Sequence, residues 1–145
     1  MSLSEPVKEF EGELDRPENE QIIQFLKQFQ PSAHIDIVQL LVKSAEALPD
    51  IKFYCPDTDN HAYYLAHTPD GVIFAAAIGM SALMYRLPKQ SMSGALVKGG
   101  EIFRDIGEPW VSFNPFWPEN EKHDSDAYLD EMKQWCRLAY HNAMK

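Results

Sequence analysis

The chain has 145 residues, a net charge of −9, 45% apolar residues and 12% aromatic residues. This length fits one domain that buries about two thirds of the surface its unfolded form exposes, and the apolar content excludes wholesale disorder. No segment gathers the Lys and Arg residues that neutralise a phosphate backbone, so we expect neither nucleic acid nor an anionic membrane surface as a partner.

The N-terminal segment is the most acidic part of the chain. The first 20 residues hold seven acidic side chains against two basic ones, which accounts for −5 of the net charge. Residues 1–17 lack sustained apolar periodicity and contain the breakers Gly12 and Pro17. We therefore expect a flexible acidic arm over 1–17 and a single domain over 18–145. No basic segment followed by an apolar one opens the chain, so we expect a cytoplasmic protein.

Two amphipathic helices are expected at the start of the domain. The first begins near Glu18 and is stopped by Pro31, because proline cannot donate the helical hydrogen bond. Ser32 is then expected to cap a second helix, which continues to Pro49. The apolar positions at helical spacing are Ile22, Phe25, Leu26 and Phe29, then Ile35, Val38, Leu41, Val42, Ala45 and Leu48.

From Ile51 onward the apolar period changes to two, which predicts strands. Thr68–Gly71 has the residues of a type I turn, with proline second and glycine fourth. We expect the first four strands to form an antiparallel meander, followed by two further strands. The expected strands are 51–55, 61–67, 72–78, 82–87, 102–106 and 110–113.

Two more helices complete the predicted domain. A short one over 91–98 ends at the Gly-Gly pair 99–100, and the last begins at Asp124 or Ser125. Helices at both ends of a run of strands predict an α+β fold rather than a parallel doubly wound one. We expect an antiparallel sheet of four to six strands, with two N-terminal helices, one short internal helix and a long C-terminal helix packed on one face.

Histidine and cysteine spacing argues against a metal centre and against a disulfide. His61 and His67 share a strand face but stand about 20 Å apart, too far for both to bind one ion. Cys55 and Cys136 lie far apart in the sequence without a Cys-x-x-Cys motif, so we expect two free thiols. No segment has a catalytic spacing of nucleophile, base and acid or a phosphate-binding glycine loop. We expect no catalytic residue, no metal and no cofactor.

Arg86 is the charge of most interest, because it ends an apolar strand. Alternation places it on the face of Ala82 and Met84. Three interpretations remain open: a solvated or rim position, a structural salt bridge, and recognition of a ligand.

The segment from Trp110 to Trp117, WVSFNPFW, packs four aromatic residues into eight positions. Aromatic side chains are enriched at binding hot spots, and they also clamp loops onto a core. We expect core anchoring overall, with Phe116 or Trp117 as the exposed residue if the segment binds a partner. The candidate ligand- or partner-binding residues are therefore Arg86, Trp110, Phe116 and Trp117.

The order of GVIFAAAIGMSALMYRLP, a Gly-Gly helix end, GEPWVSFNPF and a closing helix with Trp135 resembles a family of small uncharacterised bacterial α+β proteins. The resemblance covers about residues 70–143 and implies a style of fold, with no catalytic residue. A looser similarity is to the YjbR and TfoX N-terminal type of domain. The acidic charge and the two leading helices argue against a DNA-linked role for this chain.

The sequence thus predicts a small non-enzymatic domain, monomeric or homodimeric, that binds another protein or a small ligand. One alternative is a small enzyme with a composite pocket near Arg86 and the 110–117 segment. A second alternative is an acidic secretion chaperone or immunity protein.

Overall fold

The computed structural model describes residues 16–29, 32–56, 62–116 and 125–145. The predicted acidic arm lies outside these residues except for Arg16 and Pro17. The elements in chain order are η1 (Pro17–Asn19), α1 (Glu20–Phe29), α2 (Ile35–Ala45), β1 (Lys52–Tyr54), β2 (Tyr64–His67), β3 (Ile73–Ile78), β4 (Ala82–Arg86), η2 (Lys89–Ser91), α3 (Met92–Val97), β5 (Glu101–Ile102), β6 (Trp110–Phe113) and α4 (Asp126–Ala143). The predicted α+β class is confirmed.

The strands form a single antiparallel sheet in the order β1-β2-β3-β4-β6-β5. The expected meander of four strands is confirmed. The strand expected over 102–106 is wrong beyond Ile102, because residues 104–106 form a turn. In that turn the amides of Ile106 and Gly107 both donate to the carbonyl of Phe103, so they are not available to a neighbouring strand.

The N-terminal caps of α2 and α4 test two predictions made from the sequence. Ser125 caps α4, as one of the two predicted residues, and its hydroxyl accepts from the Tyr128 amide at 3.2 Å. The prediction of Ser32 as the cap of α2 is wrong. The cap is His34, whose Nδ1 accepts from the Asp36 amide at 3.0 Å. Ser32 instead forms an isolated bridge to Ala62, which keeps the chain extended at that point.

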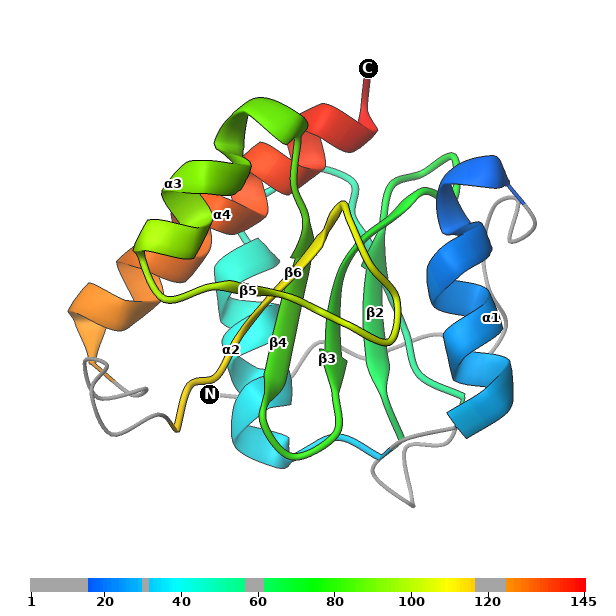
Figure 1. The fold of residues 1–145 in the computed structure, drawn as a ribbon, viewed down its shortest axis with the longest axis horizontal. Coiled ribbons are helices and arrows are strands. Elements are labelled where there is room, and N and C mark those ends of the chain that lie inside the picture. The colour runs from blue at the N-terminus through cyan, green and yellow to red at the C-terminus, as the bar shows by residue number, and fades with distance from the viewer. Residues whose placement is uncertain (1–15, 30–31, 57–61, 117–124) are drawn as a thin grey trace.

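Helices cover both faces of the sheet, so the expectation of helices on one face is wrong for α1. Figure 1 shows α1 on one side of the sheet and α2 with α4 on the other. The first buried cluster joins α2, α3 and α4 to one face, through residues such as Phe74, Tyr85 and Phe113. The second cluster joins α1 to the opposite face and is made by Ile22, Phe25, Leu26, Leu65, Ile73, Ala76, Ile78, Met84 and Trp110.

A change of register in β3 decides which of its residues face each cluster. Ala75 pairs with Ala66 and Ile73 pairs with His67, so Phe74 has no partner in β2. This extra residue is a β-bulge, and it interrupts the alternation of side chains. Phe74 consequently joins the first cluster, where its ring lies 5.6 Å from that of Tyr140.

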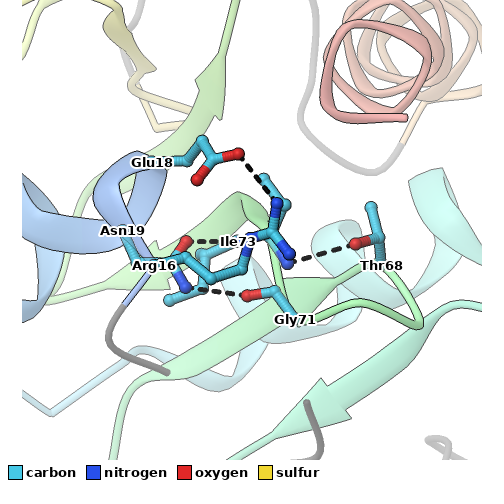
Figure 2. A network of polar contacts seen from close by, with 7 residues as sticks. Arg16, Glu18, Asn19, Thr68, Gly71 and Ile73 are labelled. Atoms are coloured by element: carbon cyan, nitrogen blue, oxygen red, sulfur yellow. Dashed lines mark hydrogen bonds and ion pairs between the residues drawn. The ribbon is translucent and has the colours of Figure 1, made fainter. Parts of the chain in front are cut away.

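Asn19 attaches the start of α1 to the turn between β2 and β3, as Figure 2 shows. Its Nδ2 donates to the Gly71 carbonyl at 2.7 Å, and its Oδ1 accepts from the Ile73 amide at 2.8 Å. The turn expected at Thr68 is confirmed by the hydrogen bond from the Gly71 amide to the Thr68 carbonyl at 2.9 Å. The fully buried Asn19 therefore satisfies two main-chain groups more than 50 residues away.

Replacing Asn19 with Ala should lower the free energy of unfolding by about 2–4 kcal/mol, because the Gly71 carbonyl and the Ile73 amide both lose their partner while buried. Urea denaturation followed by circular dichroism measures this loss. Gln21→Ala is the control, because the Gln21 side chain also donates hydrogen bonds to main-chain carbonyls but is itself exposed to water. Equal losses in the two variants would contradict the role given to Asn19.

Two glycines of the α3 region should respond to substitution in opposite ways. A Cβ on Gly100 would lie 2.7 Å from Val111 Cγ1 and 2.9 Å from the Ala95 carbonyl oxygen. We expect Gly100→Ala to destabilise the protein by about 1–3 kcal/mol through overpacking.

Gly94 lies inside α3, where an added Cβ meets only Trp135 at 4.0 Å. Gly94→Ala should therefore stabilise by about 0.5–1 kcal/mol in the same urea measurement.

Candidate functional site

Arg86 and Trp110 lie directly opposite each other on neighbouring strands. Arg86 ends β4, Trp110 begins β6, and the two are partners in the register. The Leu87 amide donates to the Pro109 carbonyl at 3.0 Å. Residues 87 and 109 are thus a hydrogen-bonded pair, and 86 and 110 form the adjacent non-hydrogen-bonded pair, whose Cα atoms lie about 4.5 Å apart. This type of pair brings the two side chains closest together.

The pair lies on the sheet face that α1 covers. Trp110 belongs to the second cluster, and Arg86 follows Met84 of the same cluster by two positions. Gln21, in the first turn of α1, donates through Nε2 to the carbonyls of Ile106 and Glu108, at 3.3 and 3.0 Å. The start of α1 and the chain leading into β6 are therefore joined beside the pair.

The guanidinium of Arg86 is half-buried and has no hydrogen bond or ion pair to any described residue. Its Nε is fully shielded from solvent. Burial lowers the pKa of this guanidinium, and the charge of Glu18 acts in the opposite direction as a smaller effect. Glu18 is already occupied by Arg16, at 3.0 Å between Arg16 Nη2 and Glu18 Oε2. The hydrogen bond from Arg16 is also the main reason that the pKa of Glu18 is lowered.

Trp110 is a core residue with an unsatisfied donor. Its side chain has no exposed surface, and its indole Nε1 has no acceptor among the described residues. A buried indole N–H usually has a hydrogen-bond partner. Two buried donors without acceptors, Nε of Arg86 and Nε1 of Trp110, are thus carried by directly opposed residues.

The other two candidates from the aromatic segment do not join this pair. Phe116 packs against the first cluster, on the opposite face of the sheet from Trp110, and its ring lies 4.9 Å from that of His34. Trp117 lies outside the described residues. Of the four candidates, the structure therefore brings together Arg86 and Trp110. Trp110, Val111 and Phe113 are all buried, as expected for a segment anchored in the core.

A second candidate site is an open groove at the other end of this sheet face, which we call the α3–β5 groove. It encloses about 1050 Å³. It is lined by residues 96–105 together with Ser81, Ala82, Ser112 and Asn114. Its lining includes no residue of α1, so it occupies the part of the face that α1 leaves open.

The α3–β5 groove combines apolar and charged groups. Leu96 and Val97 at the end of α3 are 42% and 85% exposed, so two adjacent aliphatic side chains face water beside the groove. Lys98, Glu101, Arg104 and Asp105 contribute two charges of each sign. Sequence reasoning missed this site. The available signal was an aliphatic Leu-Val pair one residue before the Gly-Gly helix end, at a position where a helix normally turns polar residues to solvent.

The two cysteines are buried and free. Burial raises the pKa of the Cys136 thiol to about 12. Burial also raises the pKa of the Tyr85 hydroxyl, which donates to Ser44 Oγ at 3.0 Å because Ser44 itself donates to the Leu41 carbonyl. These groups are core residues held in their neutral forms.

Within the described residues, no group of three histidine, cysteine, aspartate or glutamate side chains is placed to hold a metal ion. None of the helices in the described part of the chain is both long and apolar enough to cross a membrane. Comparison of the sequence with protein-family models and with curated proteins, and of the fold with solved structures, gives no match. The resemblance to YjbR- and TfoX-like domains stays a prediction.

The raised pKa of Cys136 makes stability fall at alkaline pH. Because the folded pKa is about 12 and the ordinary value is 9.0, the unfolded chain loses this proton first, and stability declines as pH rises from about 9 towards 12. Between pH 8 and 10.5 the thiol should contribute a loss of about 2 kcal/mol. Urea denaturation of the wild type and of Cys136→Ala at both pH values checks this. The same pH-dependent loss in both proteins would contradict it.

Proposed function

We propose that this protein is a cytoplasmic, non-catalytic binding domain whose α3–β5 groove takes an extended segment of a partner protein. The observation that carries the proposal is the exposed Leu96–Val97 pair at the edge of the groove. Large aliphatic side chains held in water beside a groove lose exposed apolar surface when a partner covers them, and this stabilises the complex.

The floor and edge of the groove suit a polypeptide. Ala82 and Ser112 contribute small side chains to the floor, which lets a main chain approach the sheet closely. The lining combines the four charged residues with apolar ones such as Leu96 and Ile102, a mixture that protein interfaces also show. The volume of about 1050 Å³ lies at the upper limit of small-molecule pockets, which enclose about 300–1000 Å³. A chain segment fits this open shape better than a small ligand does.

The chemistry of the lining favours binding over catalysis. It contains no histidine or cysteine among the described residues. The Ser112 hydroxyl donates to the Glu101 main-chain carbonyl at 3.4 Å, and a carbonyl oxygen is not a base that could activate a nucleophile. The enzyme alternative would need the composite pocket of Arg86, Trp110, Phe116 and Trp117, of which the described residues bring only the first two together. The chaperone and immunity-protein alternatives remain forms of the same binding role.

The test is selection of peptides from a displayed random library on the immobilised protein, followed by affinity measurement with fluorescently labelled peptides. We expect Val97→Asp, which places a charge at the groove edge, and Ser112→Leu, which fills the floor, to raise Kd at least about tenfold. Val97 is 85% exposed, so its replacement should not affect folding.

Leu138→Asp is the matched control, because Leu138 is a 39% exposed aliphatic residue on α4 that does not line the groove. It should leave Kd unchanged. Selected peptides that bind the wild type and both groove variants equally, or a library that yields no binder, would overturn the proposal.

A further inference from the structure

We infer that Arg86 and Trp110 form a binding site for a carboxylate group, in which Nε and an Nη of Arg86 and the indole Nε1 of Trp110 donate to the carboxylate oxygens. This site is separate from the α3–β5 groove and does not depend on the function proposed for it.

The first argument is the absence of an acceptor for two buried donors. An arginine at a strand end is ordinarily solvated or paired with an acid, yet Nε of Arg86 is shielded from water and unbonded in the described structure. The same is true of Nε1 of Trp110. Buried donors without acceptors are destabilising, and an acceptor supplied by a ligand would satisfy them.

The second argument is placement. Because the two residues are a non-hydrogen-bonded pair on adjacent antiparallel strands, their Cβ atoms lie about 4.5–5.5 Å apart and both side chains leave the same face of the sheet. The two side chains are therefore close enough for one carboxylate group to bridge them.

The third argument is charge, and it selects the class of anion. Glu18 is the acid whose charge acts on Arg86, but its carboxylate already binds Arg16. Arg16, Glu18 and Arg86 together carry one net positive charge. One excess charge matches a monoanion, whereas a phosphate dianion would also be repelled by Glu18. The planar edge formed by Nε and Nη of arginine matches the two oxygens of a carboxylate.

The test is nuclear magnetic resonance of the ¹⁵N-labelled full chain titrated with sodium acetate, with sodium chloride added to hold ionic strength constant. The Nε–H signal of Arg86 and the Nε1–H signal of Trp110, assigned from the variants Arg86→Lys and Trp110→Phe, should shift together and saturate. The titration itself is followed in the wild type, and at this step the variants serve only to assign the two signals.

The variants then test each donor. Arg86→Lys keeps the charge and loses the planar fork, so the apparent Kd for acetate, followed at the Trp110 signal, should rise at least about tenfold. Arg137→Lys, at an exposed arginine on α4, should leave it unchanged. Inorganic phosphate should bind more weakly than acetate.

Three results would overturn the inference: no saturable shift in the wild type, the same shifts with chloride alone, or equal acetate binding in Arg86→Lys. A peptide with a free C-terminus and its amidated form distinguish the two sources of a carboxylate. Acetate binding with no preference for the free C-terminus would assign the site to small carboxylic acids, and a preference would assign it to a polypeptide end.

Discussion

Burial of both faces of β3 is the constraint on which the rest of the structure depends. All six residues of this central strand are buried, so neither face can be left to water and helices must cover both. Helices α2 and α4 cover one face. Helix α1 covers the other and is attached by Asn19, which satisfies the Gly71 carbonyl and the Ile73 amide at the start of β3.

The covering by α1 is incomplete, and the candidate sites follow from that. Six strands at about 4.8 Å spacing make a sheet about 24 Å wide, whereas one helix is about 10 Å across and covers roughly two strands. The buried members of the second cluster accordingly lie mostly on β2 and β3, with Met84 from β4 and Trp110 from β6. Ala82, which packs at the margin of this cluster, and Ser112 line the open α3–β5 groove.

Arg86 lies at the boundary of the same covering. Its Nε is shielded from solvent, but Glu18 of η1, the acid whose charge acts on it, pairs with Arg16 instead. The result is a half-buried cation beside a fully buried indole whose N–H has no acceptor in the described structure. The intermediate burial of Arg86 leaves its guanidinium partly desolvated and partly exposed.

The sequence by itself determined the features that depend on residues only a few positions apart. These are the helical and strand periods, the Thr68 turn, the Ser125 cap and the α+β class. It named Arg86 and Trp110 from residue type and alternation, and it placed them together only in the alternative of a composite enzyme pocket. Only the tertiary structure decided that these two are cross-strand partners, that α1 crosses to the other face, and that part of that face stays open. Those outcomes rest on contacts such as Asn19 with Gly71, 52 residues apart, and on how much sheet one helix can cover. No local pattern encodes them, because periodicity gives each element a buried face without saying what covers it.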